Sequence, residues 1–295
     1  MRFDLFRGQA IPWRDFVEDV RFIETTGAGT CWVLDHYVYP PAPEAQILDS
    51  WTALGGLAAV TERIRLGTMV TDAALRHPAL LAKQIATVDR ISDGRVDVTI
   101  GAGHFQEELE SLGISFLTPR GRVERLREAV EIVDGLLRER RLSYEGEHWS
   151  VRDATLVPVP VQEPRPPLFV AANGKRGLRL AAERADTSVT LGDDRETTTE
   201  QAVLSLRARN DLLDQLCADL EREPENLERA YFFGWAIERP FESAESLRDY
   251  LGRYGEAGTE RFVFSFARQS PNGMAVTRET WQSFAGEILA SAVGA

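Results

Sequence analysis

The sequence has 295 residues, of which 43% are hydrophobic, and a formal net charge of −12. This length suits one large barrel or two ordinary domains, and the acidic balance argues against a nucleic-acid or anionic-membrane partner. No run of about 18 uncharged apolar residues could span a membrane. The N-terminus has no signal-peptide pattern, and two isolated cysteines, Cys31 and Cys217, fit a reducing compartment. We therefore expect a cytoplasmic protein.

Short apolar runs containing β-branched residues alternate with segments of helical periodicity along the chain, as in a protein built from β-α units. Eight segments are expected to form strands: residues 2–6, 30–35, 64–70, 96–100, 168–172, 188–191, 231–237 and 261–266. Helices are expected over residues 13–25, 50–61, 78–94, 119–139, 175–184, 197–220 (as one helix or two), 244–254 and 277–292. Continuous apolar character at residues 31–34 indicates a strand that is buried on both faces.

This alternation predicts an α/β fold, specifically a (β/α)8 TIM barrel with insertion segments. An open doubly wound sheet is the alternative. Eight units without a break in composition fit a closed barrel better, so we expect one domain over residues 1–295. The clearest insertion is residues 140–167, in which YEGEHW suggests a small hairpin and five prolines exclude a long helix.

The stretch from Ile64 to Gly103 is the best-defined β-loop-α-β unit. Pro78 suits the first turn of its helix, and Gly94 falls where a helix often ends in a left-handed residue. In such units, ligands meet the loops at the carboxyl ends of the strands. We therefore expect the functional site near residues 69–72 and 101–108.

His36 is the best catalytic candidate, because it directly follows a buried strand and would project from the catalytic rim of a barrel. Histidine titrates near neutrality and can take or give a proton in a reaction at neutral pH. The alternative is a loop histidine bonded to a neighbouring carbonyl. Asp35, the residue before it, can equally be a cap for the following loop. The four histidines are scattered in a way that predicts no metal site.

Gly101-Ala102-Gly103 lacks the third glycine of a dinucleotide-binding fingerprint, because Gln106 stands at that place. The role we expect for Ala102 and Gly103 is close approach of the backbone to a flat ligand. Asp72 can bond the edge of such a ligand or only the loop backbone. Glu107 is a further candidate contact, although it and Glu108 also fit the solvent-facing side of a helix.

Asn173-Gly174 stands between an expected strand and an expected helix. The backbone N–H groups of such a helix start make a ready anion site, to which Lys175 and Arg176 add positive charge. A plain turn between strand and helix is the alternative at this position.

Several of these segments together resemble the bacterial-luciferase-like superfamily of flavin- and deazaflavin-dependent oxidoreductases. They are CWVLDHY at 31–37, RIRLGTMV at 63–70, RHPALLAKQIATVDRISDGR at 76–95, IGAG at 100–103, RVERLREAVEIV at 122–133 and FVAANG at 169–174. The resemblance covers most of residues 1–186 and implies a TIM barrel. Asp35-His36 matches the Asp-His pair of the deazaflavin branch, in which the histidine acts on the substrate side and the aspartate lies beside the coenzyme ring.

The resemblance also implies where a coenzyme lies. A non-proline cis peptide is expected within Thr68-Met69-Val70, with the ring packed against Met69 and Val70, whereas the residue types alone suggest an ordinary strand end. The phosphate-bearing side chain of the coenzyme is expected at Asn173, Gly174 and Gly177.

Two positions depart from the pattern of the sugar-phosphate-oxidising relatives. His104 stands where these relatives carry an acidic proton donor. Gly192-Asp193-Asp194 stands where they place a basic residue for a phosphorylated substrate. Because two carboxylates would repel a phosphate, we expect an uncharged or cationic substrate.

Together these features predict an oxidoreductase that transfers a hydride between the deazaflavin coenzyme F420 and a small-molecule substrate, with His36 exchanging the proton. An FMN-dependent monooxygenase is the alternative within the family. A barrel that binds a flavin-like ligand without turnover is the alternative from another class. Members of the family commonly form homodimers, and no dimer patch can be read from this sequence.

Overall fold

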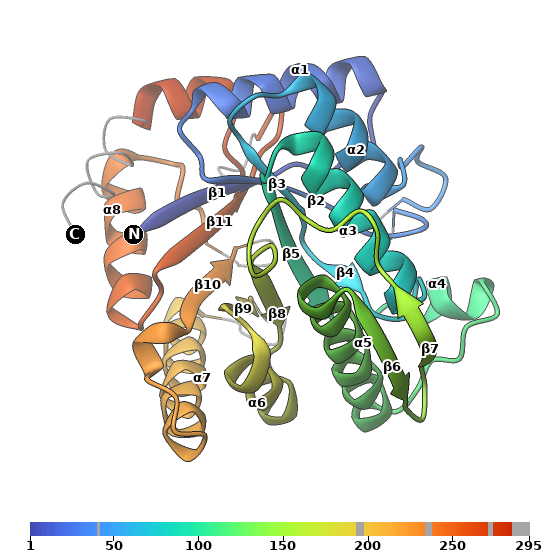
Figure 1. Cartoon of the computed structure of the whole chain (residues 1–295). Helices are drawn as coiled ribbons and strands as arrows, with labels where there is room; N and C mark the ends of the chain where they lie inside the picture. The colour runs from blue at the N-terminus through green and yellow to red at the C-terminus, as the bar shows by residue number, and fades with distance from the viewer. Residues whose placement is uncertain (40–41, 193–197, 234–237, 271–273, 285–295) are drawn as a thin grey trace.

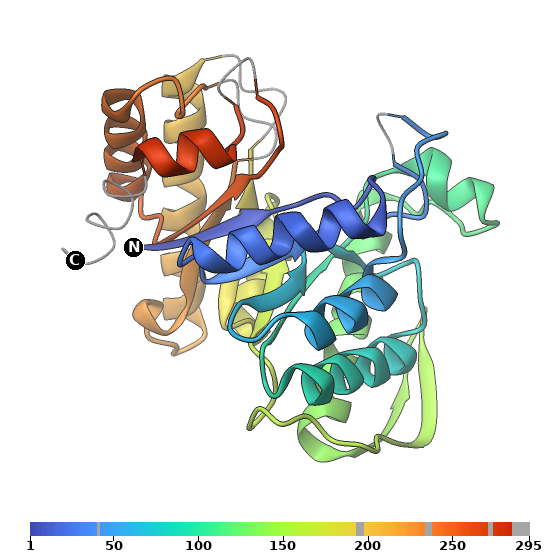
Figure 2. The same ribbon diagram turned by 90° about the horizontal axis from the view of Figure 1, so that it is seen from above.

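The computed structural model describes residues 1–39, 42–192, 198–233, 238–270 and 274–284. In this part of the chain, eight parallel strands close into a barrel that is surrounded by helices (Figures 1 and 2). The strands are β1 (Arg2–Phe6), β2 (Thr30–Val33), β3 (Arg65–Thr68), β5 (Val96–Gly101), β8 (Leu168–Ala171), β9 (Thr187–Leu191), β10 (Glu228–Phe232) and β11 (Arg261–Ser265). The barrel closes because β3 pairs with both β2 and β5, and β1 pairs with both β2 and β11.

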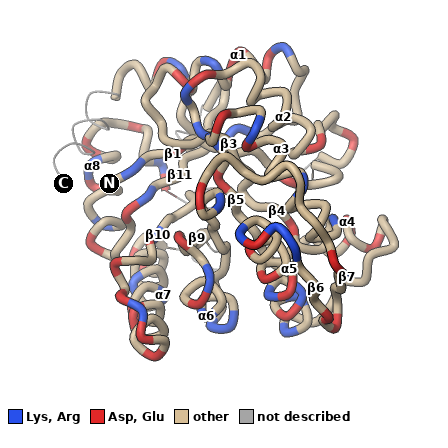
Figure 3. The backbone as a smooth tube through the Cα atoms, in the orientation of Figure 1, with Lys and Arg blue, Asp and Glu red and all other residues tan. Residues whose placement is uncertain are grey.

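The helices follow the strands along the chain. They are α1 (Trp13–Thr25), α2 (Ser50–Val60), α3 (Pro78–Ser92), α4 (Gln106–Ser111), α5 (Pro119–Glu139), α6 (Lys175–Arg184), α7 (Thr199–Asp219), α8 (Ala244–Glu256) and the short 3-10 helix η1 (Pro224–Asn226). Charged residues of both signs are interspersed along the outer helices, as on α5 and α8 (Figure 3). No helix in the described ranges is long and apolar enough to cross a membrane.

The insertion between α5 and β8 contains the expected hairpin. Its strands are β6 (Arg141–Glu145) and β7 (Ser150–Thr155), which pair antiparallel beside α5 (Figure 1). A two-residue strand, β4 (Thr71–Asp72), extends the edge of the barrel and pairs with the carboxyl end of β5.

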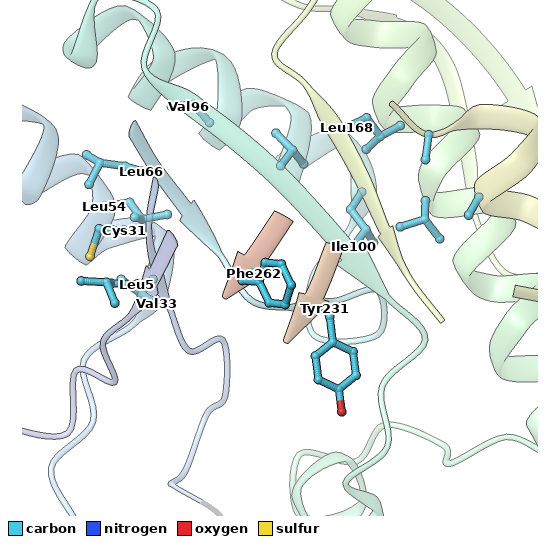
Figure 4. Packing of buried hydrophobic residues seen from close by; sticks show 14 of the residues in the cluster. Leu5, Cys31, Val33, Leu54, Leu66, Val96, Ile100, Leu168, Tyr231 and Phe262 are labelled. Carbon is cyan, nitrogen blue, oxygen red and sulfur yellow. The ribbon is translucent and has the colours of Figure 1, made fainter. Parts of the chain in front are cut away.

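Two apolar cores follow from the alternation of side chains along the strands. Cys31 of β2 belongs to the core between strands and helices, where Figure 4 shows it gathered with Leu54 of α2 and Leu66 of β3. Trp32 belongs instead to the core inside the barrel, so β2 is buried on both faces as predicted. The interior core consists of Trp32, Met69, Phe169, Ala171, Val189, Ala230, Phe232 and Val263.

The end of α3 shows why the second strand of the central unit begins where it does. Asp93 and Gly94 are both left-handed, with φ of 54° and 83°, so the helix stops as predicted at this point. The guanidinium of Arg95 then donates to two helix carbonyl oxygens. One is that of Ser92 at the end of α3 (2.8 Å), and the other is that of Ala58 in the last turn of α2 (3.0 Å). These contacts satisfy helix carbonyls that have no partner within their own helix.

Charged side chains fill the barrel at the amino ends of the strands. Asp4 of β1 accepts a hydrogen bond from Nη1 of Arg261 of β11 (3.0 Å), and Arg261 also donates to Glu228 of β10 (2.9 Å). Asp97 of β5 pairs with Arg65 of β3 (2.6 Å). This charged layer, Asp4, Arg65, Asp97, Glu228 and Arg261, ties together strands from both ends of the chain.

All eight expected strands are present, with boundaries shifted by a few residues. The largest shift is in β10, which begins at Glu228 rather than at Tyr231, while residues 234–237 of the expected strand lie outside the described residues. The helix expected over residues 277–292 is seen at residues 278–284, and its remainder lies outside the described residues. The expected long helix near residue 200 is a single helix, α7.

Candidate functional site

Three loops meet at the carboxyl ends of β2, β3 and β5, which are neighbours in the barrel. His36 follows β2, the Met69-Val70 pair follows β3, and the Gly101–Gly103 turn leads from β5 into α4. The structure therefore brings together the two regions in which the sequence predicts a site. Nδ1 of His36 lies 2.9 Å from Oε2 of Glu108 on α4, and this contact joins the first loop to the third.

Glu108 is buried, with only 2% of its surface exposed. Its other oxygen, Oε1, accepts the backbone N–H groups of Tyr37 (2.6 Å) and Val38 (3.1 Å). Burial raises the pKa of Glu108, but the hydrogen bonds from His36 and from these backbone groups outweigh it, so the pKa lies below the ordinary value. The interpretation of Glu108 as a solvent-facing residue is therefore wrong. Glu107, the neighbouring carboxylate on α4, is exposed.

Two aromatic rings flank the imidazole of His36. The ring of His104 lies edge-on to it at 5.9 Å, and the ring of Phe105 lies edge-on at 6.2 Å. The pKa of His104 is below its ordinary value because of desolvation and because of the nearby His36. His104 is therefore a second imidazole at this rim, in contact with that of His36.

Asp35 is engaged within the protein. Arg76 donates to both of its carboxylate oxygens, one at 2.9 Å, and the hydroxyl of Ser50 donates to it at 2.5 Å. Asp35 and Arg76 are both largely buried, so this ion pair is shielded from solvent. Asp35 thus joins the end of β2 to the start of α2 and to the loop before α3.

The peptide bond between Met69 and Val70 is cis, as the family resemblance predicts. Met69 is buried in the interior core, and its N–H donates to the carbonyl of Val33 (2.8 Å). Val70 is partly exposed at the rim and packs against Gly101 of β5, where an added Cβ would lie 2.9 Å from Cγ1 of Val70. The absence of a side chain at Gly101 is therefore what lets Val70 sit against the strand.

The carboxylate of Asp72 packs against the backbone of Gly103. Gly103 has φ of +75°, and a Cβ added there would overlap the carboxylate of Asp72. This carboxylate accepts the N–H of Ala74 (2.7 Å) and is 6% exposed. Burial raises its pKa to about 6, against the smaller opposing effects of the Ala74 hydrogen bond and of Arg125. Ala102, between the two glycines, is partly buried and packs against the core between strands and helices.

The raised pKa of Asp72 predicts a pH dependence of stability. Because the folded-state value lies above the unfolded one, the folded chain binds the proton more tightly, and this stabilisation is lost as the pH rises from about 4 to about 6. The free energy of unfolding of wild type minus that of Asp72→Asn should fall by on the order of 1 kcal/mol between pH 5 and pH 7.5. Urea unfolding of both proteins at the two pH values measures this, and a difference that does not change with pH would contradict it.

The turn between β8 and α6 holds the remaining predicted contacts. The amide of Asn173 donates to the carbonyl of Leu191 (3.0 Å) and accepts its N–H (3.1 Å), so this side chain ties the turn to the end of β9. Gly174 is exposed, and a Cβ added there would meet nothing within 4 Å. At Gly177 a Cβ would lie 2.6 Å from that of Ala172, which gives this glycine a packing role inside the turn. No side chain caps the start of α6.

Two of the residues predicted to lie at this rim, Asp193 and Asp194, are outside the described residues. Arg125 of α5, which the sequence does not single out, is 6% exposed, and its Nε and Nη2 have no hydrogen-bond partner in the described part of the chain. Its charge acts on Asp72 and lowers the pKa of that carboxyl. Glu108, Arg76 and Arg125 are thus the site residues that sequence reasoning missed.

The model of the luciferase-like monooxygenase family matches residues 1–286. The F420-dependent glucose-6-phosphate dehydrogenase of Kineococcus radiotolerans is 34% identical over 191 residues, which are 62% of this chain and 54% of that protein. The chain therefore spans little more than half the length of this relative.

Two solved structures share the fold. The F420-dependent secondary alcohol dehydrogenase, in complex with an F420-acetone adduct, has a TM-score of 0.76 at 20% identity and covers 90% of this chain and 92% of its own. A monooxygenase from Streptomyces bottropensis has a TM-score of 0.79 at 18% identity and covers 99% of this chain and 100% of its own. At these identities the likeness extends to the fold alone. The match of the family model is what assigns the sequence: the chain belongs to the luciferase-like monooxygenase family.

Proposed function

We propose that this chain is an oxidoreductase that uses F420 to transfer a hydride to or from a small organic substrate. The main support is the pairing of His36 with Glu108 beside the Met69-Val70 and Gly101–Gly103 segments. A proton-exchanging imidazole there borders a surface of backbone and small apolar side chains. The F420-dependent relatives named above support the choice of coenzyme.

The residues of the rim fit the coenzyme in their chemistry. Val70 offers partly exposed apolar surface for a flat ring, and Ala102 and Gly103 let it approach the backbone closely. The uncapped start of α6 offers backbone N–H groups to the phosphate-bearing side chain, beside the exposed Lys175 and Arg176. When bound there, F420 would supply a two-electron hydride acceptor or donor.

The contributions of the protein are positioning and proton exchange. His36 takes the proton of a substrate hydroxyl as the substrate is oxidised, or returns it to a carbonyl oxygen in the reverse direction. Asp35, fixed by Arg76, and Asp72, packed against Gly103, border the ring position rather than exchange this proton. The substrate class that suits this arrangement is a small alcohol or its carbonyl product, and Asp193-Asp194 favours an uncharged or cationic one.

An FMN-dependent monooxygenase is the second candidate. The description of the family favours it. A flavin-binding barrel without turnover is the remaining alternative. We further propose that residues 1–295 form one domain, that the protein is cytoplasmic and that it forms a homodimer, as the resemblance and the composition suggest.

The experiment that tests this function is an equilibrium titration of the purified protein with F420 and with FMN, followed by absorbance or fluorescence. We expect tighter binding of oxidised F420, and tighter binding of FMN would overturn the choice of coenzyme. Hydride transfer is then tested as the loss of F420 absorbance with a panel of small alcohols, including 2-propanol. Binding of F420 without turnover on any alcohol or carbonyl compound would favour the non-catalytic alternative.

A matched pair of glycine variants tests the anion site in the same titration. Gly174→Val places a side chain in open space at the start of α6, where the backbone angles of −98° and 150° suit valine. We expect the F420 affinity to fall roughly fivefold to tenfold, because the side chain screens the helix N–H groups from the phosphate. Gly252→Val on α8, which is also exposed and open, should leave the affinity unchanged.

A further inference from the structure

The imidazole of His36 is held on three sides. Glu108 binds Nδ1 at 2.9 Å, and the rings of His104 and Phe105 stand edge-on to it. The His36 side chain is 11% exposed, whereas that of Glu108 is fully buried. The ring is therefore fixed by contacts from α4 and the residues just before it, and its other nitrogen, Nε2, is the one left for a substrate.

We propose that Glu108 is a positioning residue that holds neutral His36 in the tautomer protonated at Nδ1, so that Nε2 is the atom that exchanges the substrate proton. This inference rests on the oxidoreductase function proposed above. When an alcohol is oxidised, its O–H and carbinol C–H bonds break and a C=O bond forms. The proton goes to Nε2 of His36, and the hydride with its electron pair goes to oxidised F420, which is thereby reduced.

The hydrogen bonds of Glu108 determine this tautomer. Oε1 is already occupied by the N–H groups of Tyr37 and Val38. Oε2 faces Nδ1 of His36, and an ionised carboxylate can only accept hydrogen bonds. The proton of the neutral imidazole must therefore lie on Nδ1, which leaves a lone pair on Nε2. A carboxylate in this position also stabilises the imidazolium that forms once Nε2 takes the proton.

The same geometry makes Glu108→Gln an informative variant. The glutamine has the same shape, and its single oxygen is needed by the two backbone N–H groups that Oε1 now accepts. Its NH2 group must then face Nδ1 of His36. Because an NH2 group can only donate, Nδ1 becomes the acceptor and the proton moves to Nε2. The variant should fold normally but present the wrong nitrogen to the substrate.

The experiment reads the tautomer directly from the 15N resonances of the histidine rings, at a pH at which His36 is neutral. His36→Asn identifies the His36 signals among those of the four histidines. In wild type we expect Nδ1 to resonate as a protonated nitrogen and Nε2 as an unprotonated one, and in Glu108→Gln we expect the reverse. Glu110→Gln, an exposed change on the same helix, should match wild type.

Kinetics with an alcohol oxidised by wild type complete the test. Glu108→Gln should lower kcat by about 10² or more, while KM for the alcohol and the affinity for F420 stay close to wild type. A wild-type proton on Nε2, or a glutamine variant with unchanged tautomer or unchanged kcat, would overturn the inference. The ring measurement needs no coenzyme, so a protein that fails to bind F420 would refute the proposed function without deciding the tautomer.

Discussion

Replacing His36 with alanine should lower the turnover number with an oxidisable substrate by about 10² or more, the usual scale for loss of a general acid–base group. The affinity for F420 should barely change. Asp35, the residue before His36, is held by hydrogen bonds from Arg76 and Ser50, and neither of these bonds involves the imidazole. Steady-state kinetics and a coenzyme titration on the same preparation measure the two effects separately.

His36→Asn should fail in the same way, because an amide forms hydrogen bonds but does not exchange a proton at neutral pH. Normal turnover in His36→Ala would contradict the catalytic role. The proton would then have to come from His104, Glu107 or water. A variant that lost coenzyme affinity together with activity would instead make His36 a binding residue.

The largest expected effect on stability comes from breaking the Asp35–Arg76 ion pair. Arg76→Met would leave Asp35, 2% exposed, without its charged partner. Removal of one partner of a buried pair costs about 3–5 kcal/mol, because the remaining charge is desolvated and uncompensated. We expect a loss of this size in the free energy of unfolding, measured with urea.

Two further variants define this result. The double variant Asp35→Asn with Arg76→Met should regain much of the loss, since no buried charge remains. Arg141→Met breaks the pair with Asp153, in which both side chains are more than half exposed, and should leave the free energy of unfolding nearly unchanged. Equal losses for Arg76→Met and Arg141→Met would contradict the role of burial.

The fold could be predicted because its signals are local. The alternation of apolar runs with helical periodicity gives all eight strands, and Pro78 and Gly94 mark the limits of α3 within two residues. The short α4 could not be predicted in the same way, since six residues carry too little periodicity. The cis peptide at Met69-Val70 was predicted from the family resemblance, because the residue types alone suggest an ordinary strand end.

The site was predictable only in part, for a physical reason. His36 could be identified because it follows a buried strand directly. Glu108 is distant from His36 in sequence, and its burial depends on α4 folding back over the loop after β2. Arg76 and Asp35 are likewise brought together only when the strands close. Such pairs join segments that are far apart in the sequence, so no spacing in the sequence marks them.

The charged layer at the amino ends of the strands has a consequence for how such a protein can diversify. Asp4, Arg261 and Glu228 link β1, β10 and β11 at the end of the barrel opposite the candidate site. Closure of the barrel is therefore stabilised at the end opposite the candidate site. Loops at the other end can lengthen, shorten or exchange residues while the scaffold stays shut. The rim loops can therefore change in sequence, and with them the substrate, while the strand pairing that closes the barrel is kept.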